Sequence, residues 1–235
     1  MRKLLLVLVI PALALAGCEK ESGSGGGADD EGSAVAESGQ AKGKETAGAG
    51  DQRFAGFDPA AEQKALQGTW KVLDSAFAKE PAIWKIEGAA VTISRGDETK
   101  QGELEIGYPG ELAFVEEAGG GKQRSYFAYA RSGDEVYIGL GTAGIKRGDT
   151  YMLADGGVVV FDGEKCQFHK KKMFGGWEDP VAVTCKLAAE GEEQVLHYEV
   201  PHRFKKGEKK AKQVDVIGDL LLNEQMQGHK AERSK

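Results

Sequence analysis

Apolar and polar residues alternate with a period of two along most of the chain beyond residue 68. The alternation falls in short runs rich in β-branched and aromatic residues, such as TWKVLDS, RSYFAYAR and QVLHYEV, and glycine-bearing segments separate the runs. A period of two is typical of β-strands that bury one face. The pattern therefore predicts an all-β domain.

Gly-Asp or Asp-Gly pairs separate many of these runs. They occur at 133–134, 148–149, 155–156, 162–163 and 218–219. Tight turns between successive strands predict an antiparallel meander. A long meander must protect its edge strands, either by closing into a barrel or by folding into two packed sheets. We expect a barrel, and the alternative is a β-sandwich.

One segment before the strands departs from the alternation, FDPAAEQKALQG at 57–68. Asp58 suits a helix N-cap, Pro59 suits the first turn, and Gly68 can end the helix. We therefore expect a short helix ahead of the barrel. A single β-rich domain is predicted over residues 52–227, followed by a polar tail at 228–235.

The beginning of the chain has a different pattern. Two basic residues precede an apolar run at 4–15, which is typical of a secretory signal peptide and too short to span a bilayer. The run ends in Leu-Ala-Gly-Cys, which resembles the lipobox of bacterial lipoproteins. This resemblance implies a signal peptide at 1–17, cleavage between Gly17 and Cys18, a diacylglyceryl group on the Cys18 thiol and a further acyl chain, such as palmitate, on its amino group. The alternatives are an ordinary signal peptide with an incidental cysteine, or a short buried helix.

The composition of residues 18–51 predicts a disordered tether, which begins with the lipidated cysteine. From residue 19 they hold eight acidic residues, three lysines and almost no large apolar residue, so they cannot bury enough surface to offset chain entropy. Glu19 follows the cysteine. In enterobacteria an aspartate at that position favours the inner membrane, so with Glu19 the lipoprotein resemblance favours the periplasmic face of the outer membrane, and the alternative is the inner membrane.

The charge of the remaining chain is nearly balanced. After residue 51 the chain has 26 basic and 29 acidic residues. A nucleic-acid-binding domain typically has an excess of basic residues, and this domain does not. We therefore expect no nucleic-acid partner.

Gly68-Thr69-Trp70, directly after the predicted helix, resembles the Gly-x-Trp motif of lipocalins and related calycin barrels. The resemblance implies that Trp70 closes one end of the barrel and that an arginine from the far end of the chain lies on its ring. Arg233 is the candidate for that arginine. The Thr-Asp-Tyr motif of the main lipocalin family is absent, and the chain has more than eight short strands, which departs from the family.

The resemblance further implies a barrel interior that binds a small hydrophobic or amphipathic ligand. The aromatic residues expected to line or close such a pocket are Trp70, Trp84, Phe114, Tyr126, Phe127 and Tyr129. The same residue types are equally suited to an ordinary packed core.

Cys166 and Cys185 flank a predicted hairpin whose turn is Gly175-Gly176. With that turn they lie directly opposite each other, so in an oxidising compartment we expect a disulfide, and the alternative is two free buried thiols. Strand parity places both cysteines on the apolar face and His169 and His197 on a polar, solvated face. We therefore predict no metal site and no cofactor.

Catalytic motifs are not evident. GLGTAG at 139–144 has the spacing of a dinucleotide loop, but a turn and a strand follow it where such a site needs a helix. No set of nucleophile, base and acid stands out from the sequence, so we expect a binding protein rather than an enzyme.

A second hypothesis is an envelope interaction module without a cavity, which binds a protein or an anionic polymer through a basic surface. The residues proposed for that surface are Arg203, Lys205, Lys206, Lys209, Lys210 and Lys212. The alternative interpretation of this cluster is a charged, solvated loop.

Overall fold

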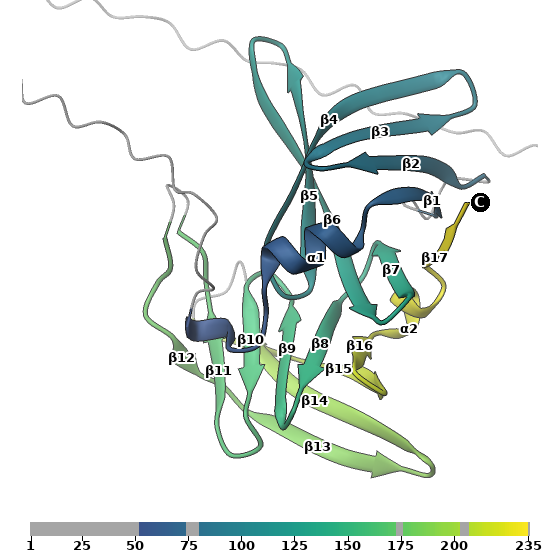
Figure 1. The fold of residues 1–235 in the computed structure, drawn as a ribbon. Coiled ribbons are helices and arrows are strands. Elements are labelled where there is room, and N and C mark those ends of the chain that lie inside the picture. The colour runs from purple at the N-terminus through teal and green to yellow at the C-terminus, as the bar shows by residue number, and fades with distance from the viewer. Residues whose placement is uncertain (1–51, 74–79, 173–175, 203–206, 235) are drawn as a thin grey trace, which may run out of the picture. The chain divides into compact units, whose positions relative to one another are not determined.

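The computed structural model describes residues 52–73, 80–172, 176–202 and 207–234, and nearly all of its regular structure is β-strand (Figure 1). The helices in these described ranges are a short 3-10 helix, η1 (Gln52–Phe54), and two short α-helices, α1 (Pro59–Ala65) and α2 (Glu224–Gln227). The predicted all-β fold is confirmed. Among the described residues, no helix is long and apolar enough to cross a membrane.

Helix α1 begins where the sequence predicts. The Asp58 carboxylate accepts hydrogen bonds from the backbone N–H groups of Ala60 and Ala61, at 3.0 and 3.3 Å. Pro59 occupies the first turn, where its missing N–H leaves no donor unsatisfied.

Eight strands form a closed antiparallel barrel. In chain order they are β1 (Gly68–Val72), β2 (Ala82–Glu87), β3 (Ala90–Arg95), β4 (Glu98–Tyr108), β5 (Glu111–Ala118), β6 (Gly121–Ser132), β7 (Glu135–Gly139) and β17 (Lys230–Arg233). The first seven follow one another as a meander, and β17 lies between β7 and β1 to complete the ring. Closure into a barrel is therefore confirmed.

The prediction of a polar tail at 228–235 is wrong. Residues 230–233 form β17, whose Arg233 lies opposite Trp70 on β1 and whose Lys230 lies opposite Tyr137 on β7. The domain therefore extends past residue 227.

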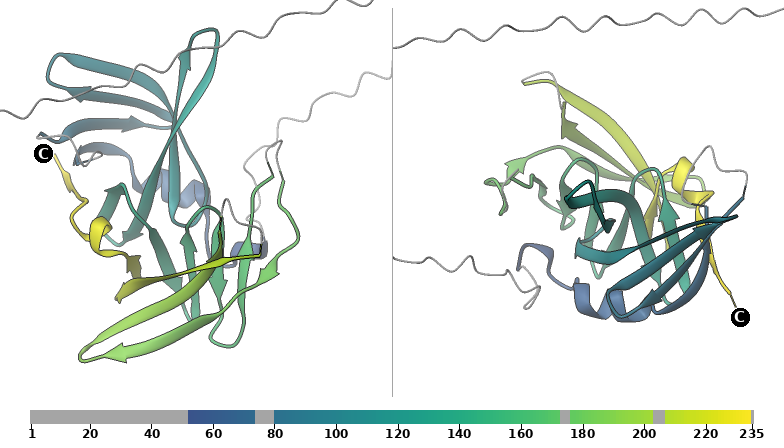
Figure 2. Two further views of the ribbon diagram at one scale, coloured as in Figure 1. Left: turned by 180° about the vertical axis from the view of Figure 1, so that it is seen from behind. Right: turned by 90° about the horizontal axis from the view of Figure 1, so that it is seen from above.

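The other nine strands form a second antiparallel sheet, which we call the curled sheet. They are β8 (Ala143–Arg147), β9 (Thr150–Ala154), β10 (Val158–Phe161), β11 (Cys166–His169), β12 (Val181–Ala182), β13 (Cys185–Glu190), β14 (Glu193–Pro201), β15 (Lys209–Ile217) and β16 (Leu220–Leu222). It is inserted in the chain between the seventh and eighth barrel strands, and Figure 1 shows it, coloured from green to yellow, below the blue and teal strands β1 to β6. Figure 2 shows the same arrangement from behind and from above.

The two end strands of the curled sheet, β12 and β13, are successive pieces of one extended segment. Between them, the Val183 N–H donates to the Cys166 carbonyl at 3.0 Å, and the Thr184 carbonyl accepts from the Glu199 N–H at 2.9 Å. Adjacent residues of an extended chain direct their backbone groups to opposite sides. This segment therefore has β11 on one side and β14 on the other, so the sheet curls until its ends meet.

Three strands of the curled sheet, β8 to β10, contribute side chains to two apolar cores, one on each face. On β8 to β10, Ile145, Met152 and Val158 belong to the core that fills the barrel. Leu153 and Val159, one residue away from these positions, belong to the core inside the curled sheet. Strands buried on both faces explain the nearly continuous apolar runs in this part of the sequence.

The predicted contact between Trp70 and Arg233 is confirmed. The Arg233 guanidinium lies 4.7 Å from the centre of the Trp70 ring, and the indole N–H donates to the Leu66 carbonyl at the end of α1 at 2.8 Å. The ring is buried, so the helix, the first strand and the last strand meet on one side chain.

Replacing Arg233 with alanine is expected to lower the free energy of unfolding by about 0.5–1 kcal/mol, the usual range for an exposed cation–π contact. Urea denaturation measures the loss. Glu232→Ala, an exposed position on the same strand, controls for the strand itself. An equal loss in both variants would show that the ring contact is not the cause.

A buried carboxylate joins α1 to both sheets. Glu62 accepts hydrogen bonds from the Tyr129 hydroxyl at 2.7 Å and from the Arg131 guanidinium at 2.8 and 3.1 Å, and it lies 3.7 Å from Arg147 on β8. Burial, and then the Glu62 charge, raise the pKa of Tyr129 well above its usual value. This arrangement holds the helix in one position, because moving the helix away would leave the buried Glu62 carboxylate without either arginine.

Candidate ligand-binding hollow at the barrel seam

Five of the six aromatic residues expected to line a ligand pocket belong to the barrel core or pack against it, and Tyr126 does not. Trp70, Trp84, Phe114 and Tyr129 are each at most 2% exposed and belong to the core that fills the barrel. Tyr126 is instead 58% exposed, and Phe127 is half-buried. Side chains therefore occupy the part of the barrel where the sequence led us to expect a ligand.

Tyr126 and Phe127 line a hollow of about 170 Å³ at the place where the barrel meets the curled sheet. We call it the seam hollow. Its walls come from the start of β5, the middle of β6, the link between β7 and β8, and the turn between β9 and β10. Besides the two aromatic residues, the side chains of interest around it are Glu111, Leu140 and Asp155.

Glycines at the seam allow the two sheets to approach closely. Gly110 has a φ of +88°, and a Cβ atom there would lie 2.3 Å from the Ala143 carbonyl oxygen and 2.4 Å from the Ala154 nitrogen. A Cβ at Gly139 would lie 2.2 Å from the buried ring of His229. Because no side chain fits at either position, backbone forms part of the wall of the seam hollow.

Glu111 is a partly buried carboxyl group at the start of β5. It accepts a hydrogen bond from the Tyr108 hydroxyl. Burial raises the pKa of Glu111, although the Tyr108 hydrogen bond and the charge of Lys171 act in the opposite direction. Burial and the neighbouring Glu111 raise the pKa of Tyr108 well above its ordinary value, so this hydroxyl stays protonated as a donor.

Asp155 lies in the turn between β9 and β10, on another wall of the seam hollow. Its carboxylate accepts a hydrogen bond from the Tyr198 hydroxyl at 2.8 Å and forms an ion pair with Lys212. Burial and the Asp155 charge raise the pKa of Tyr198. The carboxylate is therefore fixed in place by two groups from the far side of the curled sheet.

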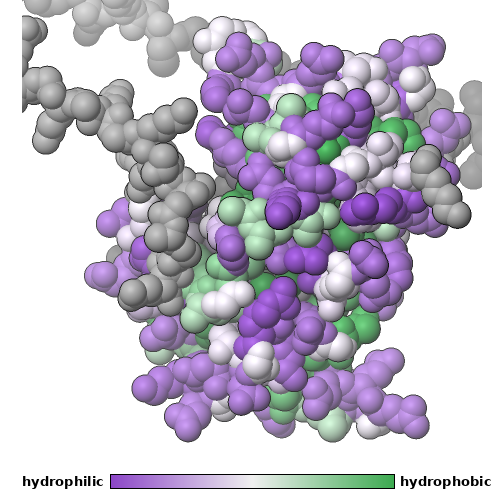
Figure 3. Space-filling model, viewed as in Figure 1, coloured by the Kyte–Doolittle hydropathy of each residue, from purple (hydrophilic) through white to green (hydrophobic). Residues whose placement is uncertain are grey.

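Two exposed hydrophobic side chains, Tyr126 and Leu140, stand at the seam hollow. Within the part of the chain that the structure describes, the exposed large hydrophobic residues are Tyr126, Leu140, Val181 and Ile217. Two of these four stand at the same hollow. The face of the molecule shown in Figure 3 is mostly covered by hydrophilic side chains.

The sequence predicted Tyr126 and Phe127 as ligand-binding candidates but missed Glu111, Leu140 and Asp155. Each of these three lies at or next to a glycine-bearing turn. The sequence could not identify them, because the composition of a turn does not show whether its side chains line a hollow or face open solvent.

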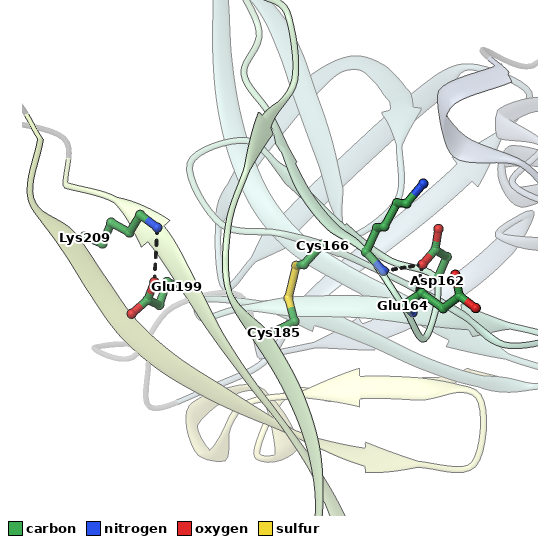
Figure 4. The surroundings of a disulfide bond; sticks show 7 residues. Asp162, Glu164, Cys166, Cys185, Glu199 and Lys209 are labelled. Carbon is green, nitrogen blue, oxygen red and sulfur yellow. Dashed lines mark hydrogen bonds and ion pairs between the residues drawn. A yellow bond between two sulfur atoms is a disulfide. The ribbon is translucent and has the colours of Figure 1, made fainter.

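The predicted disulfide between Cys166 and Cys185 is confirmed (Figure 4). The predicted register is wrong by two residues, because Gln167 pairs with Ala182, which places Val183 rather than Cys185 opposite Cys166. A shift of two preserves the face of every side chain. Both cysteines therefore still face the apolar core of the curled sheet, and the bond joins the two ends of that sheet, with a Cα–Cα distance of 5.7 Å.

The expectation that His169 faces solvent is wrong. Its side chain is 4% exposed and its ring packs against Phe54 of η1, with the ring centres 5.7 Å apart, because the helix covers that face of β11. His197 is half-exposed and its Nε2 lies 3.0 Å from Glu190. Among the described residues, no three or more His, Cys, Asp or Glu side chains are grouped to hold a metal ion.

The predicted basic surface is only partly described. Arg203, Lys205 and Lys206 lie outside the described residues, as do Gly17 and Cys18. Lys209 and Lys210 are exposed, and Lys209 forms an ion pair with Glu199 (Figure 4) with an N–O distance of 3.4 Å. Lys212 does not belong to an open basic surface, because it is partly buried and ion-paired with Asp155.

Fold and site together define an all-β protein with a packed eight-stranded barrel, an inserted curled sheet and a small hollow at their seam. The chain matches no protein-family model, and no significant match to a curated protein or a solved structure was found.

Proposed function

We propose that this protein is a bacterial envelope lipoprotein whose β-barrel domain binds a small amphipathic molecule at the seam hollow. The observation that carries the binding role is the exposure of Tyr126 and Leu140 beside a hollow of about 170 Å³. Exposed apolar side chains that gather at a concave site with a few fixed polar groups are typical of ligand recognition. The role proposed is binding without catalysis and without a cofactor.

The anchor is proposed from the lipobox resemblance at 15–18. Two or three acyl chains on Cys18, at about 0.8 kcal/mol per buried methylene, would hold the protein on the periplasmic face of the outer membrane. The lipocalin-like character of the barrel is likewise a proposal. Its support is the junction of α1, Gly68 and Trp70 with Arg233.

Replacing Cys18 with serine is expected to remove all acyl chains and to release the protein from the membrane fraction, because serine offers no thiol for the diacylglyceryl group. Intact mass spectrometry of the protein from a bacterial host measures the acyl groups, and membrane fractionation measures the anchoring. Cys166 and Cys185 are unchanged in this variant, so the disulfide serves as a control for folding. An unacylated parent protein would contradict the proposal.

Binding at the seam hollow can be followed by tryptophan fluorescence. Phe127 lines the hollow, and its ring packs edge-on against Trp84 with the ring centres 5.2 Å apart. The mature protein in phospholipid nanodiscs is titrated with hexanoate, hexyltrimethylammonium and hexyl glycosides, with empty nanodiscs as the blank. We expect saturable quenching or a spectral shift with at least one probe, and no saturable response to any of them would contradict the binding role.

The packed barrel interior favours a second candidate function, that of an interaction module for an envelope protein or an anionic polymer. Trp70, Trp84, Phe114 and Tyr129 leave the interior without the open pocket that a lipocalin-like ligand would need. Neutralising Lys209 and Lys210 together tests this candidate. Attachment to envelope fragments that is unchanged by the two substitutions would exclude these lysines as the contact.

A further inference from the structure

The dimensions of the seam hollow limit what it can hold. Its volume of about 170 Å³ is below the roughly 300–1,000 Å³ of sites for drug-sized ligands. An acyl chain of ordinary length would need a long channel, whereas a single ring or a short chain matches a hollow of this size. The part of the ligand inside the hollow is therefore compact.

The charges of the two carboxylates are offset by neighbouring lysines. Lys212 forms an ion pair with Asp155, and the Lys171 ammonium group lies 5.6 Å from the ring centre of Tyr108, the hydrogen-bond partner of Glu111. An isolated pair of acids would attract a cation, but these acids already have basic neighbours. The electrostatics therefore favour an uncharged ligand.

The same carboxylates remain capable of accepting hydrogen bonds. An ionised carboxylate offers about four lone-pair positions. Glu111 receives the Tyr108 hydroxyl, and Asp155 receives the Tyr198 hydroxyl and the Lys212 ammonium group. Hydroxyl groups of a ligand are suitable donors for the positions that these contacts do not use.

Tyr126 adds a flat apolar surface. Its side chain is more than half exposed, and Leu140 lines the same hollow. A saturated ring with hydroxyl substituents has one apolar face of C–H groups and a polar edge. Such a ring can lie on an aromatic side chain while its edge donates hydrogen bonds to carboxylates.

We propose that the seam hollow binds the uncharged, hydroxylated ring of a sugar unit, which stacks on Tyr126 and donates hydroxyl hydrogen bonds to Glu111 and Asp155. This inference rests on the proposed binding function and names the ligand class for it. The sugar can be the headgroup of a glycolipid or a unit of an envelope polysaccharide, and both present the same chemistry to the hollow.

The head-group preference is the first test. The mature protein in nanodiscs is titrated with hexyl glucoside, hexyl N-acetylglucosaminide, hexyltrimethylammonium and hexanoate, which share one tail. We expect one of the glycosides to bind at least about tenfold more tightly than the two charged probes, the ratio that corresponds to about 1.4 kcal/mol. Binding of the free trisaccharide of the same sugar would assign a polysaccharide, and binding of the hexyl glycoside alone would assign a glycolipid.

The site of binding is tested by substitution of Tyr126. Tyr126→Ala is expected to weaken glycoside binding at least about tenfold, as is usual for an aromatic residue at the centre of a contact. Tyr126→Phe keeps the ring and is expected to bind within about twofold of the parent, since the affinity comes from stacking. Ile217→Ala removes another exposed apolar side chain and should leave binding unchanged.

The possible failures are distinguishable. Glycoside binding that survives Tyr126→Ala overturns the sugar site. Equal binding of all four probes, or binding of the charged probes alone, also overturns it while leaving an amphipathic ligand at the seam hollow in place. Absence of binding by every probe contradicts the proposed function itself.

Discussion

Replacing Trp84 with alanine is expected to lower the free energy of unfolding by about 3–5 kcal/mol, the range for truncating a large buried aromatic side chain. Trp84 is 0% exposed, lies opposite Trp70 on the neighbouring strand and packs against Phe127. The loss is large because the total stability of a domain is only about 5–15 kcal/mol. Urea denaturation followed by circular dichroism measures it.

Two variants accompany this measurement. Trp84→Phe keeps a ring in the barrel and is expected to cost less than the alanine variant, because it leaves a smaller void. Ile217→Ala alters an exposed side chain and is expected to change stability by no more than about 0.5 kcal/mol. A small loss for Trp84→Ala would contradict a tightly packed interior and would restore the barrel as a possible ligand cavity.

Removing the disulfide by replacing Cys166 and Cys185 together with alanine is expected to cost about 3 kcal/mol, because a crosslink between residues 19 apart restricts the unfolded chain. The disulfide also joins β11 to β13, where the two ends of the curled sheet meet. The midpoint of urea denaturation should therefore fall. The parent protein unfolded and refolded under reducing conditions should reach the same stability as the double variant.

The single-cysteine variants are less informative, because each leaves an unpaired thiol that can react. A double variant with the midpoint of the parent would show that backbone hydrogen bonds between the sheet ends already supply the closure. In that case the disulfide would contribute little beyond the contacts of Val183 and Thr184.

Much of the local structure could be predicted because each signal was contained in a few neighbouring residues. The alternation identified most of the strands, Asp58 and Pro59 identified the helix start, and the spacing of the two cysteines identified the disulfide. The hairpin register was displaced by two residues, but the error changed no side chain from one face to the other. Face assignments are thus more robust than exact pairing.

The division into barrel and curled sheet could not be predicted, because alternation does not say which distant strand completes a sheet. β17 is short and polar, and only Ala231 is buried in it, so its four residues resemble a tail. The burial of His169 depends on η1, more than a hundred residues earlier. The residues that line the seam hollow are up to about 45 positions apart in the sequence. No local sequence pattern indicates that they lie together.

The position of β17 has a consequence for the order in which the protein folds. The first seven barrel strands are complete by residue 139, but the strand that pairs with both β1 and β7 begins only at residue 230. Until those residues are available, β1 and β7 each have an edge without its barrel neighbour, and such edges favour pairing with other chains. The contact that closes the barrel spans most of the domain, which slows folding. Ring closure is therefore a late step, and a chain interrupted before residue 230 would keep both edges open.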